Sequence, residues 1–306
     1  MKARPRSRLD TALRWSPAQL LFRVRAARHL TVLAYHGIDD PDRFQQQLRH
    51  LVRTTRPVSL EQVAAAVAGT GTLPERATLL TFDDGARSLV ESGLPLLRQR
   101  GLPAVAFVVA GLLDSDRPFW WTEVERLAGD GGRVQGLAGL APAGLVRRLK
   151  QLPDGERLAA IEELRRTAAA PAPPTPQLRR AELARLESAG VAVGNHTLTH
   201  PILPRCDDGK LETEVAGAHR ALGDALGHPP ATFAYPNGDW DARAERLLAT
   251  LGYTTAFLFD HRVSPRRPDH RLRISRVRVN SDTGLDRFAA IVSGLHPAVH
   301  HVRGGA

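Results

Sequence analysis

The sequence predicts an α/β fold in which helices cover a parallel sheet. Short apolar runs of strand length alternate along the 306 residues with amphipathic stretches of helix length. The apolar runs are almost uninterrupted, which is typical of strands that are buried on both faces. There are about seven such runs, a number that suits a barrel at least as well as an open sheet.

The predicted elements follow one another in a regular order. Runs of Val, Ile, Leu, Ala, Phe and Tyr predict strands at 30–36, 78–82, 104–109, 191–194, 231–235, 254–258 and 274–279. Apolar residues at helical spacing predict helices at 44–53, 60–67, 87–100, 211–226, 242–251 and 285–293. No GxGxxG or Walker A sequence follows any strand, which argues against a nucleotide-binding fold.

Two regions depart from this alternation. Residues 112–189 lack a clear strand and contain a proline-rich stretch at 171–176, so we expect a helical insertion there, with the prolines leading into a helix at 177–188. Residues 1–28 are basic and predict an N-terminal helical arm ahead of a domain at 29–306. An amphipathic helix at 11–28 would lie on a membrane surface or pack on the domain, and the pattern fits both.

Composition and charge exclude several classes of protein. The net charge is +10, with basic stripes at 1–28 and 262–278, but neither stripe interleaves aromatic residues and no nucleic-acid-binding motif is present. No nucleic-acid partner is therefore expected. The single cysteine, Cys206, excludes an intramolecular disulfide and multi-cysteine metal sites. No apolar run is long enough to span a bilayer or resembles a signal peptide, which predicts a cytoplasmic protein.

The clearest chemical signal follows the predicted strand 78–82, where Asp83 and Asp84 precede Gly85. Two adjacent acids are costly to bury unless a cation or a separation of their pKa values relieves the repulsion. The carboxyl ends of strands form the active face of a β/α barrel. An Asp-Asp-Gly turn that caps the next helix would use the same residues, so this segment alone leaves both interpretations open.

A second signal follows the predicted strand 191–194, where His196 and His200 stand four residues apart. Such a pair can bind one metal if the segment forms a helical turn. A lone histidine is more often a surface or core residue, but this pair occurs in a chain that also has paired acids at a strand end. Together the two segments indicate a His/His/Asp metal site with an open position for water.

These motifs resemble those of the polysaccharide deacetylases that share the NodB homology domain (carbohydrate esterase family 4). Residues 81–85 read TFDDG, and residues 196–200 match the H[ST]xxH motif of that family. Residues 233–238 look like its third motif, and residues 33–37 resemble the opening strand of its poly-N-acetylglucosamine deacetylase branch. The resemblance runs from about residue 30 to about residue 280.

The resemblance implies a distorted (β/α) barrel of about seven strands and a divalent metal, zinc first, with cobalt or nickel as alternatives. Asp84, His196 and His200 would bind the metal, and Asp83 would be the general base that deprotonates metal-bound water. The backbone amide of Asn237 would join the metal in stabilising the tetrahedral oxyanion. The implied reaction removes N-acetyl, or alternatively O-acetyl, groups from a saccharide or polysaccharide precursor, free or lipid-linked.

The third motif departs from the family pattern, which commonly reads Arg-x-Pro-Tyr-Gly. Ala234 stands where the arginine that orients the catalytic aspartate would fall, so a partner for Asp83 must come from elsewhere or is missing. The late Leu-x-His that often supplies the general acid is also absent. We take His36 as the candidate acid, and a buried structural histidine as its alternative.

Residues for substrate recognition are less clearly marked. The candidates are the third-motif residues with three tryptophans that could stack on sugar rings: Tyr235, Pro236, Asn237, Trp120, Trp121 and Trp240. A tryptophan pair within an insertion forms a local core equally often. The departures also leave a second function open, that of a catalytically weak or inactive relative that binds carbohydrate in an assembly.

Overall fold

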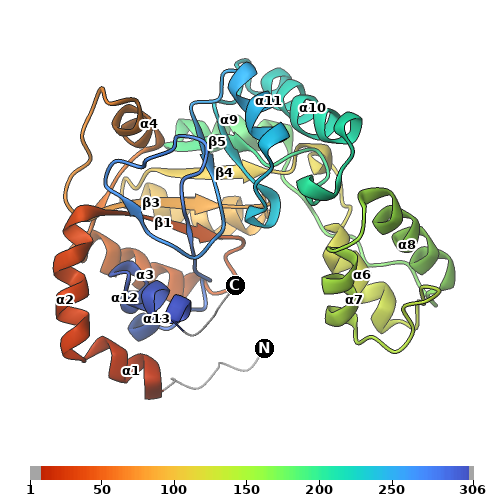
Figure 1. Cartoon of the computed structure of the whole chain (residues 1–306), viewed down its shortest axis with the longest axis horizontal. Coiled ribbons are helices and arrows are strands. Elements are labelled where there is room, and N and C mark those ends of the chain that lie inside the picture. Colours follow the sequence, from red (N-terminus) through yellow and green to blue (C-terminus); the bar gives the residue numbers. More distant parts are fainter. Residues whose placement is uncertain (1–7, 303–306) are drawn as a thin grey trace.

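The computed structural model describes residues 8–302, and its centre is a curled parallel sheet (Figure 1). The main strands lie in the order β7, β6, β5, β4, β3, β1. They are β1 (His29–Tyr35), β3 (Ala77–Phe82), β4 (Ala104–Val108), β5 (Val191–Asn195), β6 (Thr232–Ala234) and β7 (Thr255–Phe257), with the short β2 (Arg56–Pro57), β8 (Ser264–Pro265) and β9 (Val277–Arg278). Six of the seven predicted strands are confirmed, and the seventh is present as the shorter β9.

A segment near the C-terminus joins the two edges of the sheet. Val277 of β9 pairs in parallel with Leu33 of β1, and Ile274 forms a parallel bridge with Phe257 of β7. The segment 274–278 therefore lies between the first and the last of the main strands. This arrangement confirms the expected distorted barrel, in which only the short pairings of segment 274–278 close one side.

The strands alternate their side chains between the inside and the outside of the curl. One buried cluster joins residues from nearly the whole strand order: Val32, Leu79, Val105, Phe107, Ala234, Phe257 and Ile274. Their sequence neighbours pack outward in a second cluster with the covering helices, among them Leu33, Leu80, Phe82 and Ala106. Burial on both faces explains why the strands read as unbroken apolar runs.

Helices cover the outer face of the sheet. They are α3 (Pro41–Thr54), α5 (Leu94–Arg98), α9 (Arg180–Ser188), α10 (Asp208–Leu226), α11 (Ala242–Thr250) and α12 (Leu285–Val292). Helix α4 (Leu60–Ala68) differs, because its Val63 and Ala66 pack in the inner cluster. Polar caps begin several of them: Asp40 accepts from the amide of Arg43, and Ser59 forms a capping box with Gln62. The helix predicted at 87–100 differs, because a π-helical turn at Leu89–Gly93 precedes α5.

The insertion forms a helical group with its own core. It contains α6 (Trp120–Gly129), α7 (Pro142–Leu149) and α8 (Asp154–Thr167), and Figure 1 shows these helices standing beside the barrel. Their apolar side chains, among them Val124, Leu149 and Leu164, pack on one another. Helix α9, which the predicted boundaries 112–189 include, packs on β5 and α10 of the barrel instead.

The described part of the N-terminal arm consists of two helices, α1 (Arg8–Arg14) and α2 (Pro17–Arg25). They are separated at Ser16, whose side chain caps α2 by accepting from the amide of Gln19. The arm packs against α12 and α13 (Leu295–Val302). Residues 1–7 of the predicted arm lie outside the described residues. Within residues 8–302, no helix is both long and apolar enough to cross a membrane.

Candidate active site

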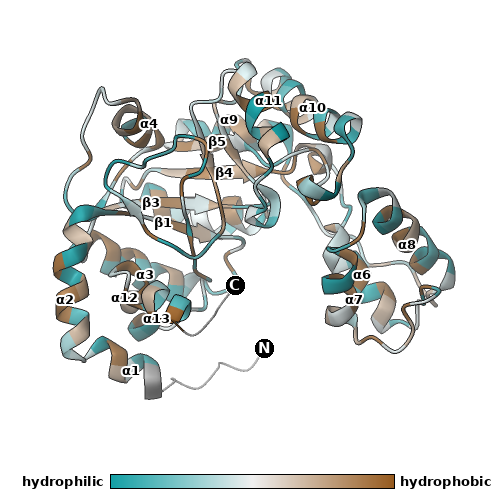
Figure 2. Cartoon of the chain, in the orientation of Figure 1, coloured by the Kyte–Doolittle hydropathy of each residue, from teal (hydrophilic) through white to brown (hydrophobic). Residues whose placement is uncertain are grey.

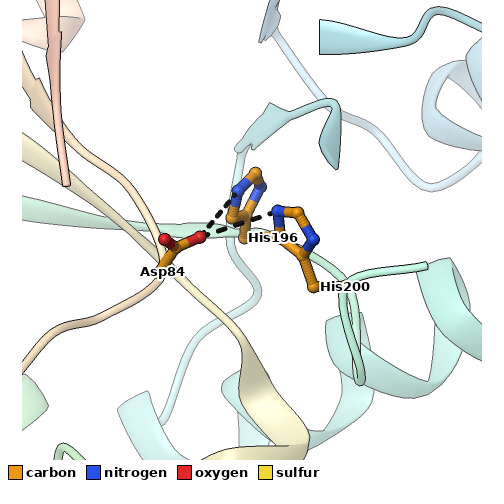
Figure 3. Close-up of side chains that lie close together, drawn as sticks. All are labelled: Asp84, His196 and His200. Atoms are coloured by element: carbon orange, nitrogen blue, oxygen red, sulfur yellow. Dashed lines mark ion pairs between the residues drawn. The ribbon is translucent and has the colours of Figure 1, made fainter. Parts of the chain in front are cut away.

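Three side chains that could bind a metal meet at the carboxyl ends of β3 and β5 (Figure 3). Asp84 follows β3, and His196 and His200 follow β5. The Nε2 atoms of His196 and His200 lie 3.5 Å and 3.6 Å from Oδ1 of Asp84. One ligand atom from each residue lies within 4.8 Å of the others, and no other group of His, Cys, Asp and Glu in the described chain meets this criterion.

A backbone carbonyl fixes the orientation of His196. Its Nδ1 lies 2.8 Å from the carbonyl oxygen of Ala234 at the end of β6. A carbonyl oxygen only accepts, so Nδ1 carries a proton and Nε2 is the ring nitrogen that faces Asp84. A hydrogen bond of this kind from the second ring nitrogen is typical of metal-binding histidines.

The segment from His196 to His200 is an irregular loop and not the helical turn that would bring such a pair together. Thr197 and His200 have positive φ angles of 68° and 56°, values that a helix does not contain. Side-chain bonds hold this backbone: the Asn195 amide oxygen accepts from the amide of Thr197, and the buried Glu214 accepts from the amide and hydroxyl of Thr199. The two imidazoles still converge, with ring centroids 4.7 Å apart.

The donor set fits a divalent cation. Oδ1 of Asp84 is buried and finds no hydrogen-bond partner among the described residues. Burial alone would raise the pKa of Asp84, but contact with His196 and the proximity of His36 and His200 outweigh it and keep the carboxyl ionised. Burial, with His196 nearby, lowers the pKa of His200 to about 3, so its lone pair is free at neutral pH. One carboxylate and two imidazoles form a common zinc-type ligand set.

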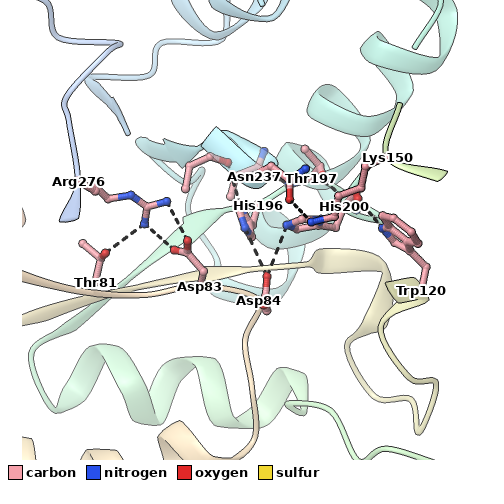
Figure 4. A network of polar contacts seen from close by, with 12 residues as sticks. Thr81, Asp83, Asp84, Trp120, Lys150, His196, Thr197, His200, Asn237 and Arg276 are labelled. Carbon is pink, nitrogen blue, oxygen red and sulfur yellow. Dashed lines mark hydrogen bonds and ion pairs between the residues drawn. The ribbon is translucent and has the colours of Figure 1, made fainter. Parts of the chain in front are cut away.

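Asp83 is held by Arg276 in a buried two-pronged ion pair (Figure 4). Nη1 of Arg276 donates to Oδ1 of Asp83 at 2.6 Å, and Nη2 donates to Oδ2 at 2.8 Å. Arg276 also donates to the hydroxyl of Thr81 and the carbonyl of Leu258, and its side chain is fully buried. Burial would raise the pKa of Asp83, but the charge of Arg276 outweighs it and holds the pKa below its usual value.

The sequence reasoning missed Arg276 as this partner. The sequence analysis assigned no role to Arg276. A usable signal was present, because residues two apart on a strand share a face. With Ile274 inside the barrel, Arg276 points inward as well and reaches the strand end that carries Asp83.

The ligands open into a cavity of about 470 Å³. It is lined by His36, Gly37, Asp39, Asp83, Asp84, Trp121, Lys150, His196, His200, Asn237, Gly238, Phe259, Arg278 and Asn280. The predicted acid His36 lies on this wall, where its ring meets Phe259 edge-on at 5.5 Å. The cavity therefore contains the predicted metal ligands, the predicted base and the predicted acid.

A lysine from the insertion also reaches this cavity, and the sequence reasoning assigned it no role. Lys150 follows α7, and its Nζ donates to Oδ1 of Asn237 at 2.8 Å. Burial lowers the pKa of Lys150 below its usual value. The insertion thus brings a cation to the turn that the third motif forms.

The third motif forms a tight turn after β6. Asn237 lies on the cavity wall with a positive φ of 56°, and the amide of Gly238 donates to the carbonyl of Tyr235. Gly238 has a φ of 83°, and a Cβ there would lie 2.4 Å from the backbone nitrogen of Phe259, so only glycine fits. Tyr235 and Pro236 are buried beneath the turn and do not line the cavity.

The three predicted tryptophans occupy different surroundings. Trp121 lines the cavity and packs on His200, with ring centroids 4.6 Å apart. Trp120 is buried in the insertion core, and its Nε1 donates to the carbonyl of His200 at 3.0 Å. Trp240 lies outside the cavity lining, with the guanidinium of Arg273 over its ring. The insertion therefore contacts the loop of the candidate metal ligand His200 through Trp120 and Trp121.

Comparison with known families agrees with this geometry. A family model described as polysaccharide deacetylase matches residues 70–137 and 159–256, together more than half of the chain. The matched ranges contain Asp83 and the three candidate metal ligands. Arg276 and Lys150 lie outside them.

Solved structures of deacetylases share the fold. IcaB from Ammonifex degensii has a TM-score of 0.60 and 21% sequence identity, and the match covers 87% of this chain and 97% of that chain. The Streptococcus pyogenes deacetylase PplD in complex with acetate has a TM-score of 0.60 and 18% identity, covering 86% and 98%. A de-N-acetylase from Aggregatibacter actinomycetemcomitans has a TM-score of 0.57 and 17% identity, covering 86% and 99%.

Proposed function

The chain belongs to the polysaccharide deacetylase family, and from this premise we propose that it hydrolyses N-acetyl groups on a saccharide or polysaccharide precursor. As a carbohydrate deacetylase it is a hydrolase that acts on carbon–nitrogen bonds. The observation that carries the proposal is the cavity in which the buried carboxylate of Asp83 stands beside three candidate metal ligands. Residues 33–37, at the end of β1, support a substrate of the poly-N-acetylglucosamine type.

We propose that Asp84, His196 and His200 hold a divalent metal. Zinc is the first candidate, because two imidazoles and one carboxylate with a fourth position open are a common catalytic zinc set, and cobalt or nickel are alternatives. When bound, the metal supplies Lewis acidity that lowers the pKa of water and polarises the acetyl carbonyl.

Different protein groups around this site accept and donate the protons that the reaction moves. Asp83, kept ionised by Arg276, accepts a proton from the water that attacks the acetyl carbon. The amide of Asn237 lies in the turn beside the cavity and donates to the oxygen that gains charge in the tetrahedral intermediate. His36, on the same wall, donates a proton to the leaving amine, so that acetate and a free amino sugar are formed.

The metal content of the purified protein tests the site without a choice of substrate. About one divalent ion per chain is expected by elemental analysis, and the double variant Asp84→Ala/His196→Ala is expected to lose it. His270→Ala, outside the cavity, is the control and keeps the metal. If the wild type bound no metal even after reconstitution, the proposed metal site would be wrong.

Release of acetate tests the activity itself. We expect the metal-loaded protein to release acetate from N-acetylglucosamine oligomers and the double variant to release none above background. Binding of the same oligomers without acetate release, in a metal-loaded protein, would favour the catalytically inactive carbohydrate-binding relative. O-acetylated sugars, tested in parallel, show whether the protein hydrolyses O-acetyl esters as well as N-acetyl amides. Lipid linkage of the substrate remains a prediction.

Replacing Lys150 with methionine is expected to lower kcat/KM by about tenfold, the effect of losing one hydrogen bond to a charged group. The variant keeps the aliphatic stem but loses the donor that holds Asn237 and faces the substrate cavity. Steady-state kinetics on the oligomers measure the effect. Arg148→Met, exposed on the same helix, is the matched control. Equal kcat/KM in both variants would contradict a role for Lys150.

A further inference from the structure

A second cavity, of about 340 Å³, lies at the end of the barrel opposite the active site. It is bounded by the arm helix α2, by α3 and α12, and by the beginnings of β1 and β3. Its lining residues Thr31 and Thr78 are near the first residues of their strands, whereas Asp83 and Asp84 follow the last residue of β3. The two cavities are therefore separated by the length of the parallel strands.

The lining of this second cavity is cationic. It contains Arg14, Arg23 and Arg76 and, among the described residues, no carboxylate. Arg14 pairs with Asp286, but no ion pair or hydrogen bond from the side chains of Arg23 or Arg76 occurs within residues 8–302. Burial and the charges of Arg14, Arg23 and Arg53 lower the pKa of His50 to about 4, which agrees with a positive potential in this cavity.

The threonine hydroxyls that line the cavity already donate hydrogen bonds to backbone carbonyls. Thr54 and Thr55 donate to the carbonyls of α3, and Thr31 donates to the carbonyl of Val292. Arg23 and Arg76 are the charged side chains of this lining that form no hydrogen bond or ion pair within residues 8–302, so their guanidinium groups are available to a ligand. Guanidinium groups bind phosphate oxygens in pairs of hydrogen bonds.

The helix beside this cavity exposes an apolar face. Leu20, Leu21 and Val24 of α2 are 66%, 59% and 69% exposed, and Trp15 just before the helix is 76% exposed. Spacings of three and four residues place the three aliphatic side chains on one face, with Arg23 and Arg25 beside them. Figure 2 shows α2 at the edge of the molecule, with hydrophobic and hydrophilic residues side by side.

We propose that the outer face of α2 (Trp15, Leu20, Leu21 and Val24) lies on an anionic phospholipid bilayer and that a lipid phosphate enters the second cavity between Arg23 and Arg76. An exposed apolar stripe bordered by arginines is the pattern of helices that lie in the membrane interface. The headgroup phosphate supplies the negative charge that the cavity lacks. The barrel then points its catalytic end away from the membrane.

Charge argues against a second copy of this chain as the occupant. A symmetric dimer through α2 would place Arg14, Arg23, Arg25 and Arg76 of one copy near the same residues of the other. No acidic side chain lines the cavity to offset this repulsion. An anionic bilayer matches both the charge and the apolar stripe.

Co-sedimentation of the full chain with vesicles tests the apolar face. We expect binding to phosphatidylcholine vesicles that contain phosphatidylglycerol, weak binding to phosphatidylcholine alone, and loss of binding as salt is raised. The variant Leu20→Ser/Leu21→Ser/Val24→Ser is expected to bind at least about tenfold more weakly. Leu158→Ser, an exposed leucine on α8, is the control and binds like the wild type.

A second variant tests the cavity. Arg23→Glu/Arg76→Glu is expected to weaken binding to the anionic vesicles by about tenfold or more, since each basic residue near the surface contributes about fivefold. Arg185→Glu/Arg246→Glu changes the net charge equally at exposed sites on α9 and α11 and is expected to have a much smaller effect. Circular dichroism and thermal unfolding check that all these variants are folded.

Three results would overturn the proposal. If the chain does not bind vesicles, or if the α2 and cavity variants bind them as well as their controls do, a membrane is not the partner of this surface. Inorganic phosphate that binds to the cavity by calorimetry, without vesicle binding, makes the ligand a free anion. Analytical ultracentrifugation that finds a dimer, dissociated by the Leu20→Ser/Leu21→Ser/Val24→Ser variant, makes the occupant a second copy. None of these results depends on deacetylase activity.

Discussion

Replacing Asp83 with asparagine is expected to lower kcat by about a hundredfold to ten-thousandfold, the usual contribution of a general base, while the metal content stays unchanged. The amide oxygen of asparagine can still accept a hydrogen bond from Arg276, so the fold around the site is retained. An amide cannot take a proton from water at neutral pH. Acetate release and elemental analysis on the same preparation measure both effects.

The control for this variant is Asp39→Asn, which removes an exposed carboxylate from the wall of the same cavity. It is expected to change kcat by less than about threefold, because Asp39 does not stand beside the metal ligands. Full turnover in Asp83→Asn would show that another group accepts the proton. Loss of metal from that variant would assign Asp83 to the metal site instead.

Replacing Arg276 with methionine is expected to destabilise the protein by about 3–5 kcal/mol and to move the acid limb of kcat/KM to higher pH. The variant leaves the buried carboxylate of Asp83 without its counter-charge and removes the bonds to Thr81 and Leu258. The charge of Arg276 no longer offsets the effect of burial on Asp83, so the pKa of Asp83 rises above its usual value instead of falling below it.

The sign of the pH effect follows from linkage. In the wild type, the folded pKa of Asp83 is lower than the unfolded value, so its contribution to stability is present above the unfolded pKa of about 3.9 and is lost as the pH falls through the folded pKa. In Arg276→Met the folded pKa is the higher of the two. The contribution then reverses, and the free energy of unfolding near neutral pH decreases.

Chemical denaturation and pH–rate profiles measure the two effects, with Arg278→Met as the control on the same segment. If Arg276→Met does not fold, Arg276→Lys keeps the charge but offers a single point of contact instead of a planar fork. An intermediate shift of the acid limb is then expected. An acid limb that stays at the wild-type pH in a folded variant would show that Arg276 does not act on Asp83.

The sequence was sufficient to predict the barrel and the grouping of the three candidate metal ligands. The alternation of apolar strands and amphipathic helices is a pattern of neighbouring residues in the chain. It is easy to recognise because the strands are buried on both faces and are therefore apolar throughout. Asp84, His196 and His200 stand directly after two strands that are parallel neighbours of β4. Because the carboxyl ends of parallel strands meet at one face of a barrel, motifs at those ends come together whatever loops connect them.

The loop geometry and the partners of these motifs were decided by tertiary contacts. The spacing of His196 and His200 suggested a helical turn, but Asn195, Thr197 and Glu214 hold the segment in a left-handed, irregular backbone instead. Local hydrogen bonds from such side chains compete with helix formation. The spacing of four was compatible with both conformations.

Arg276 shows most clearly what only the tertiary structure decided. It stands 193 residues after Asp83 in the chain and reaches that carboxylate because the segment 274–278 joins the last strand to the first. The sequence by itself determined the barrel, the strand ends and the candidate site residues that follow them. Sheet closure decided which arginine holds Asp83, and packing of the insertion decided that Lys150 and Trp121 enter the cavity.

The physical reason is that spacing along the chain specifies neighbours within an element. Partners from distant elements depend on how the sheet curls and on which side chains are buried together.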